Sequence, residues 1–159
     1  MEFKLKSQDE QTYLYIERTL SLDADMMIQL SSTDFNCIFD FLQKNDIPPL
    51  SMPMVVYPEA PDRGSNTVPF RASVVVNSED AEKARASGTI KIDKLPAGKV
   101  MSAMHIGSYN DLLKSHIALR KHIEASNLKP VPPIWDIFLD DYHDVPESEL
   151  RTEIFRAVT

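Results

Sequence analysis

The chain has 159 residues, 43% of them hydrophobic, and its 17 Lys and Arg against 24 Asp and Glu give a formal charge of −7. A domain of this size buries roughly two thirds of its unfolded surface, so it needs no disulfide or structural metal to fold. No apolar run approaches the about twenty residues of a membrane span, and residues 1–6 lack the features of a signal peptide. We therefore expect one cytoplasmic domain with no membrane partner.

Acidic residues gather toward the C-terminal end. Residues 133–159 contain seven Asp and Glu against Arg151 and Arg156, which gives this segment a local charge of −5. Direct nucleic-acid binding is not expected, because phosphate contacts need clustered Lys and Arg. The acidic field favours cations. The alternative is a solvated acidic surface that keeps the protein soluble.

Two short motifs occur twice in the same order. IPPL at residues 47–50 returns as VPPI at 131–134, and FRA at 70–72 returns at 155–157. The offsets are nearly constant, which predicts an ancient tandem duplication. The predicted repeats cover about residues 1–77 and 88–159, with 78–87 as the linker.

The hydrophobic periodicity gives both halves the same order of elements. Each half is predicted to contain two alternating strands joined as a hairpin, then a helix, then two more strands. The helices are expected to begin at Ser31 or Ser32 and at Ser108, where a hydroxyl can cap free N–H groups. The predicted strands are at residues 3–5, 12–18, 52–57, 68–76, 90–92, 99–106, 134–139 and 152–158. This pattern indicates an α+β fold with two related lobes.

Standard catalytic and cofactor motifs are absent from the sequence. Four glycines offer little material for a phosphate-binding loop, and no two of the four histidines have the i,i+4 spacing of a helical ligand pair. We therefore expect no cofactor and no metal site. His116 lies on the apolar stripe of the second helix, where we expect a hydrogen-bonded or helix-covering residue rather than a catalyst. Cys37 is expected to be a small buried hydrophobe.

One predicted strand carries an acid among large apolar side chains. Alternation places Ile134, Asp136 and Phe138 on one face, and Trp135, Ile137 and Leu139 on the other. A carboxylate in such surroundings loses hydration and needs a compensating charge or hydrogen-bond donors. A lipophilic cation could supply that charge, helped by cation–π contacts with neighbouring rings. The alternative is an internal ion pair between Asp136 and Arg151 or Arg156.

Four motifs in the second half occur in a fixed order: LPAGK at residues 95–99, HIGSY at 105–109, PPIWDIF at 132–138 and ELRTEI at 149–154. Together they resemble the GyrI-like effector-binding family of small-molecule-binding domains. That family includes stand-alone bacterial proteins, a DNA gyrase inhibitor and the ligand-sensing domains of multidrug-responsive transcription regulators. The resemblance covers the whole chain, more strongly from about residue 88 onward.

The resemblance implies a single domain, residues 1–159, built from two tandem βαββ units related by a pseudo-twofold axis around a central groove. It also implies an aromatic pocket with an acid at its base for cationic, lipophilic ligands. The family strand usually has Glu and Tyr where this chain has Asp136 and Phe138, so the carboxylate is shorter and one hydroxyl is missing. Through the internal repeat, Tyr57 is the counterpart of Phe138. The ligand-binding residues expected on this basis are Asp136, Trp135, Phe138, Tyr109, Tyr57 and, more weakly, Tyr13.

The leading hypothesis is a stand-alone, non-enzymatic protein that senses or sequesters amphipathic, cationic, lipophilic compounds. A second hypothesis follows from family members that hydrolyse electrophilic cyclopropane-containing compounds. In that case Asp136 would act with Tyr109 or Tyr57. A third is an inhibitor that binds a partner enzyme such as DNA gyrase through its acidic face.

Overall fold

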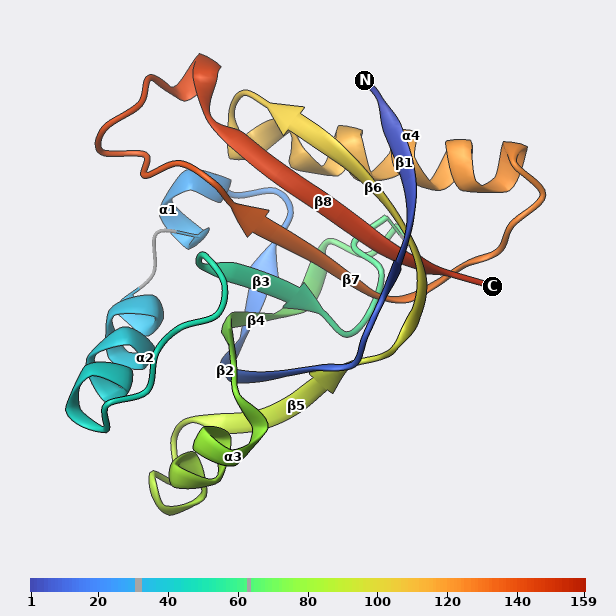
Figure 1. The fold of residues 1–159 in the computed structure, drawn as a ribbon. Helices are drawn as coiled ribbons and strands as arrows, with labels where there is room; N and C mark the ends of the chain where they lie inside the picture. The colour runs from blue at the N-terminus through green and yellow to red at the C-terminus, as the bar shows by residue number, and fades with distance from the viewer. Residues whose placement is uncertain (31–32, 63) are drawn as a thin grey trace.

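A computed structural model describes residues 1–30, 33–62 and 64–159, and in these residues eight antiparallel strands form one twisted sheet (Figure 1). The strand order is β1-β6-β8-β7-β3-β4-β2-β5. The strands are β1 (Phe3–Gln8), β2 (Gln11–Ser21), β3 (Met54–Tyr57), β4 (Thr67–Val76), β5 (Lys91–Leu95), β6 (Gly98–Ile106), β7 (Pro130–Phe138) and β8 (Arg151–Val158). Ser31 and Ser32, the predicted caps of the first helix, lie outside the described residues.

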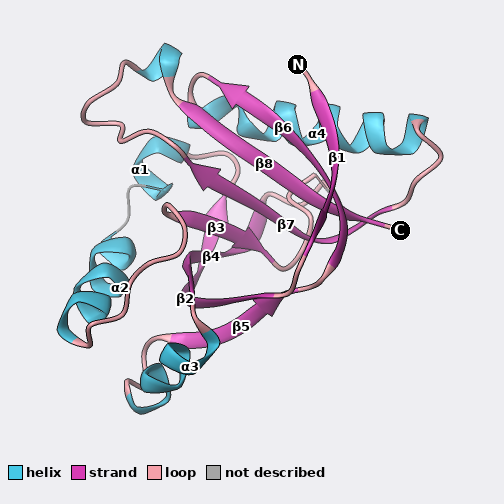
Figure 2. Cartoon of the chain, in the orientation of Figure 1, coloured by secondary structure: helices cyan, strands magenta, loops and turns pink. Residues whose placement is uncertain are grey.

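Few helices accompany the sheet (Figure 2). The sheet and these helices confirm that the fold mixes α and β structure. The α-helices are α1 (Met26–Leu30), α2 (Thr33–Lys44), α3 (Ser78–Ala81) and α4 (Leu112–Ala125), and the 3₁₀ turns are η1 (Glu82–Ala86), η2 (Tyr109–Asp111) and η3 (Glu147–Glu149). The predicted linker therefore contains α3 and η1. In the described part of the chain, no helix combines the length and the apolar character needed to cross a membrane.

The predicted hairpins are wrong, because the first strand of each half pairs with the other half. β1 pairs with β6, and β5 pairs with β2. Only Asp9-Glu10 and Pro96-Ala97 connect the strands that were expected to pair. Two-residue hairpin turns need Gly or Asn at positions of positive φ, and neither connector supplies one. The chain instead passes from one half of the sheet into the other.

The strand order is symmetric between the two halves: if each of β1–β4 is exchanged with the corresponding strand of β5–β8, the order read from one edge equals the order read from the other. The repeated FRA motif, however, does not occupy equivalent places. Ala72 lies opposite Val55 and Ile154 lies opposite Asp136, so the sheet matches Ala72 with Ile154 rather than with Ala157. The tandem duplication therefore stays a prediction.

The hydrophobic core lies on both faces of the sheet. Leu112, Leu119 and Ile123 of α4 cover one half of the first face, while α2 and α3 cover the other half. The second face has a helix-free cluster to which every strand except β1 contributes a buried side chain: Tyr13, Met54, Val56, Val75, Leu95, Val100, Trp135 and Phe155. The alternation predicted along β7 is confirmed, because Ile134 and Phe138 belong to the first face and Trp135 to the second.

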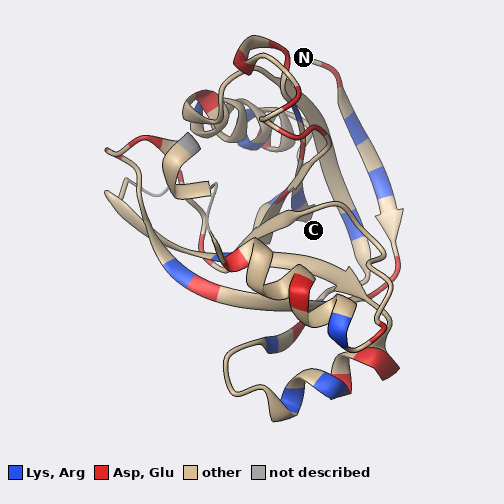
Figure 3. Ribbon diagram, turned by 90° about the vertical axis from the view of Figure 1, so that its left-hand side faces the viewer, with Lys and Arg blue, Asp and Glu red and all other residues tan. Residues whose placement is uncertain are grey.

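Both edge strands carry lysines. β1 presents Lys4 and Lys6, and β5 presents Lys91 and Lys94 (Figure 3 shows the charged positions along the ribbon). Charged side chains on an edge strand oppose pairing with a second sheet. The two strands that join the halves are thus also protected against edge-to-edge association.

Candidate functional site

A pocket of about 320 Å³ opens between α2, the turn η2, the end of β7 and the loop that follows β7. We call it the aromatic pocket, because its wall includes the rings of Phe35, Phe39, Tyr109, Phe138 and Tyr142. Phe35 and Phe39 come from the amphipathic helix α2, where positions i and i+4 lie on one face. The pocket therefore joins a helix of the first half to a strand end of the second.

Phe138 and Tyr109 form the inner wall of the aromatic pocket. Both are buried, and their ring centroids are 5.0 Å apart. Phe35 meets Phe138 edge-on at 6.4 Å. Ser108 fixes the turn that carries Tyr109, since its hydroxyl accepts the N–H of Asn110. Two of the residues predicted from the sequence, Tyr109 and Phe138, are thus brought together here.

Two acids stand in the outer wall, and their surroundings differ. The Arg151 guanidinium donates to both oxygens of Asp140, at 3.0 and 2.9 Å, and these hydrogen bonds lower the pKa of Asp140. Asp141 is exposed and accepts the backbone N–H of His143 at 2.8 Å. Among the described residues no cationic side chain forms an ion pair with Asp141. Asp140 is therefore compensated within the protein, whereas Asp141 is open to solvent.

Burial, with the nearby Asp140 and Asp141 charges, raises the pKa of Tyr109 to about 12, and burial raises the pKa of Tyr13 to about 12 as well. In the unfolded chain tyrosine titrates near pH 10. Between about pH 10 and 12 the unfolded state therefore holds fewer protons than the folded state, and stability falls as pH rises.

We expect Tyr109→Phe to reduce this alkaline loss of stability. The measurement is the free energy of unfolding in urea at pH 8, 10 and 11 for both proteins. Absorbance of the phenolate near 295 nm reports the titration directly. An unchanged pH slope in Tyr109→Phe would contradict the assignment of a raised pKa to this residue.

Asp136 lies on β7 two residues before Phe138 and is not part of the wall of the aromatic pocket. Its side chain is 0% exposed, and His116 Nε2 donates to its Oδ1 at 2.7 Å. The expectation of a hydrogen-bonded His116 is confirmed. The alternative of an arginine partner for Asp136 is wrong, because Arg151 binds Asp140 and Arg156 binds Asp62.

Tyr57 completes this buried polar group. Its ring meets the His116 ring edge-on, with centroids 6.0 Å apart. Burial, and secondly the Asp136 carboxylate, raises the pKa of Tyr57 well above its ordinary value, so the hydroxyl stays neutral. His116 Nδ1 is buried and has no hydrogen-bond partner among the described residues. Two further buried atoms without a hydrogen-bond partner among the described residues belong to β8: Thr152 Oγ1 and Arg156 Nε.

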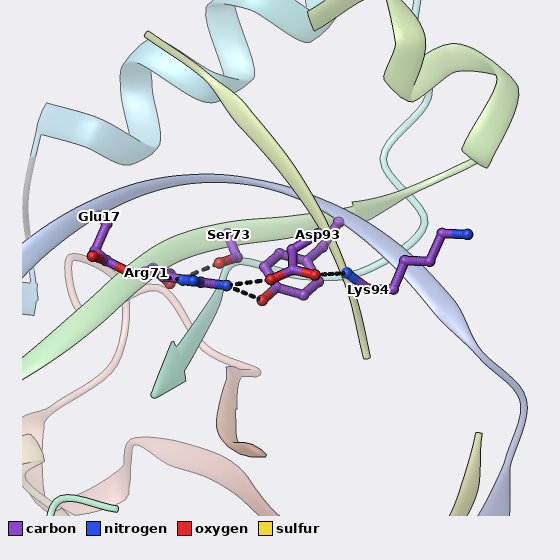
Figure 4. A network of polar contacts seen from close by, with 6 residues as sticks. Glu17, Arg71, Ser73, Asp93 and Lys94 are labelled. Carbon is purple, nitrogen blue, oxygen red and sulfur yellow. Dashed lines mark hydrogen bonds and ion pairs between the residues drawn. The ribbon is translucent and has the colours of Figure 1, made fainter. Parts of the chain in front are cut away.

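Trp135 and Tyr13 lie on the opposite face of the sheet, away from the aromatic pocket. The Trp135 ring stacks on Phe155 with centroids 5.3 Å apart. The Tyr13 hydroxyl accepts a hydrogen bond from Arg71 Nη1 at 2.8 Å, within a network that ties β2, β4 and β5 together (Figure 4). In the same network Arg71 binds Asp93 at 2.7 Å. The side chains of Trp135 and Tyr13 are therefore placed to stabilise the sheet.

The sequence reasoning missed three parts of the pocket. Phe39 was not among the ligand-binding residues expected from the sequence, and the loop that contains Asp141 and Tyr142 carries no periodic signal. Cys37 is exposed, so its expected burial is wrong. It lies one residue before Ile38, which faces the core, and adjacent helical positions point about 100° apart. Within the described residues, no group of three or more His, Cys, Asp and Glu is placed to hold a metal ion.

Solved structures share this fold at low sequence identity. The EcmrR C-terminal domain is 17% identical, with 99% of this chain and 97% of that chain covered and a TM-score of 0.69. SAV2435 bound to tetraphenylphosphonium is 16% identical, with 100% and 94% covered and a TM-score of 0.62. A hydrolase from Listeria innocua is 11% identical, with 99% and 92% covered and a TM-score of 0.62. At such identities the likeness shows the fold alone.

None of the curated protein sequences matches the chain. The family model described as the GyrI-like small molecule binding domain matches residues 1–158. This match spans nearly the whole sequence and agrees with a sheet that carries a pocket between its two halves. The chain belongs to the GyrI-like family of small-molecule-binding domains.

Proposed function

We propose that this protein binds amphipathic organic cations in the aromatic pocket and acts as a sensor or sequestering module for them. The composition of the pocket wall carries the proposal. The wall combines five aromatic side chains with two carboxylates, and the lining residues that the structure describes include no Lys or Arg. Each ring face offers a cation about 0.5–2 kcal/mol, and the apolar wall favours the rest of the ligand.

The fold neighbour SAV2435 supports the class of ligand. It is bound to tetraphenylphosphonium, a cation whose charge is surrounded by four phenyl groups. A ligand of this kind needs aromatic walls and a negative potential, and the aromatic pocket supplies both. The net charge of −7 adds to that potential.

Asp136 contributes to this function from beneath the pocket. It lies two residues before Phe138 on the same face of β7, a separation of about 7 Å along the strand. It forms a buried hydrogen bond with His116 at 2.7 Å. We propose that Phe138 and Tyr109 contact the ligand, while Asp136 and Tyr57 support the inner wall and contribute through the electrostatic potential.

A matched pair of substitutions in α2 tests the proposal. Phe39 and Phe41 both lie on α2 and pack against the core of the first half, but of the two only Phe39 lines the aromatic pocket. Titration with tetraphenylphosphonium is expected to give a micromolar Kd for the natural sequence. Phe39→Ala should weaken binding about fivefold to tenfold, as expected for the loss of about 1 kcal/mol from one ring contact. Phe41→Ala should change Kd by less than about twofold.

Two outcomes of this titration would contradict the proposal. Equal losses in the two variants would show that the binding site is elsewhere. Absence of binding by the natural sequence, with the protein folded by circular dichroism, would reject the proposed ligand class.

A further inference from the structure

We propose that the ligand's positive charge is recognised at the mouth of the aromatic pocket by Asp141, so that the preferred ligand has an apolar body with a quaternary ammonium at one end. This inference rests on the proposed function and specifies its ligand. It starts from the three acids that lie in or near the pocket: Asp136, Asp140 and Asp141. The three acids differ in their hydrogen-bond partners and in their exposure to solvent.

Two of these acids already have a partner inside the protein. Asp136 is fully buried and hydrogen-bonded to His116. Asp140 accepts two hydrogen bonds from the Arg151 guanidinium and a third from the Arg151 backbone N–H. A ligand cation would have to compete with a histidine in one case and with an arginine in the other.

Asp141 combines exposure with a fixed orientation. Its carboxylate Oδ1 accepts the N–H of His143 at 2.8 Å, and its carbonyl accepts the N–H of Asp144 at 3.0 Å. This tight turn holds the carboxylate in the outer wall of the aromatic pocket. Its other oxygen forms no hydrogen bond recorded among the described residues, so the group can receive a cation without giving up an internal partner.

The aromatic pocket is thus uncharged at its inner end and acidic at its outer end. Phe138 and Tyr109 at the inner end are buried and carry no charge, whereas Asp141 and Tyr142 at the outer end are exposed. Tyr142 follows Asp141 in the chain and lines the same pocket, and its ring lies against the His143 ring with centroids 4.1 Å apart. A carboxylate and an aromatic ring at the mouth of one pocket suit a quaternary ammonium, which forms cation–π contacts and donates no hydrogen bonds.

This arrangement discriminates ligands by where their charge lies. A ligand with a terminal ammonium can place its apolar body against Phe138 and Tyr109 while the charge stays beside Asp141. In tetraphenylphosphonium the phenyl groups surround the charge, so the same insertion moves the charge away from Asp141. Electrostatic attraction falls with distance and with screening by solvent, and this favours the end-charged ligand.

Isothermal titration of the full chain with three probes tests the inference. The probes are 4-phenylbutyltrimethylammonium, its neutral isostere with a tert-butyl group in place of trimethylammonium, and tetraphenylphosphonium. The ammonium probe is expected to bind at least tenfold more tightly than its neutral isostere. Asp141→Asn should remove most of that tenfold difference and should change the Kd of tetraphenylphosphonium by less than about twofold.

Asp144→Asn is the matched control, because it removes the same charge from the same loop at a residue outside the pocket wall. It should leave the tenfold preference in place. Equal effects of Asp141→Asn and Asp144→Asn would overturn the inference, as would a preference abolished by Asp136→Asn but kept in Asp141→Asn. Either result would leave the proposed function standing if tetraphenylphosphonium still bound. Failure of both cations to bind would instead reject the proposed function itself.

Discussion

Replacing His116 with alanine is expected to lower the free energy of unfolding by about 3–5 kcal/mol, the range observed when one partner of a buried polar pair is removed. The reason is the position of Asp136. Its side chain is 0% exposed, and the His116 side chain, itself 1% exposed, forms a hydrogen bond with it at 2.7 Å. Without the imidazole the buried carboxyl group loses this hydrogen bond, and a buried polar group without its partner costs free energy. Urea denaturation followed by circular dichroism measures the loss.

A second variant and a control separate this effect from simple truncation. His143→Ala removes an exposed imidazole and should change stability by less than about 0.5 kcal/mol. Replacing His116 and Asp136 together with leucine removes the unpaired charge, so the double variant should be more stable than His116→Ala. A loss below about 1 kcal/mol in His116→Ala would show that the pair does not hold α4 on the sheet in solution.

Trp135→Ala is expected to be similarly costly, about 3–5 kcal/mol, and to leave ligand binding unchanged. Trp135 is 1% exposed and stacks on Phe155 in the helix-free cluster. Truncation of a buried aromatic residue loses apolar contact and leaves a cavity. Because the aromatic pocket lies on the other face of the sheet, its wall is not altered. Urea denaturation gives the stability, and titration with tetraphenylphosphonium gives the Kd.

Two further variants test whether the effect of Trp135 on stability is separate from ligand binding. Trp135→Phe retains a ring against Phe155 and should lose less than half as much stability as Trp135→Ala. Tyr142→Ala, at the pocket mouth, should show the opposite behaviour, with weaker binding and a stability change below about 0.5 kcal/mol. A folded Trp135→Phe protein that no longer binds cations would place the binding site on the opposite face of the sheet.

Local periodicity predicted the features that depend on a single element. Alternation along β7 separated Phe138 from Trp135, and the amphipathic pattern of the second helix indicated that His116 faces the sheet. These assignments succeed because one strand or helix decides which of its own side chains share a face. Tyr109 and Phe138 were also expected at the ligand site through the family resemblance, and the structure places both in the inner wall of the aromatic pocket.

Features that depend on two distant elements could not be predicted in this way. Alternation in β1 indicates a strand but does not identify β6 as its partner. The sequence offered a bound cation or an arginine on the next strand as the partner of Asp136, whereas His116 reaches it from a helix, twenty residues earlier in the chain. Asp141 lies in a loop, where side-chain direction follows from turn geometry and not from a repeating pattern.

β1 and β5 each pair with a strand of the other half, and this pairing determines what happens if the chain is cut into two fragments. If the backbone were cut between Val76 and Lys91, each fragment would contain a strand whose hydrogen-bonding neighbour belongs to the other fragment. Neither fragment alone could complete its own sheet, and the aromatic pocket, built from α2 and the end of β7, would be separated as well. The two fragments should therefore regain ligand binding only by associating with each other, which makes this chain a natural candidate for complementation assays that report a small molecule through reassembly.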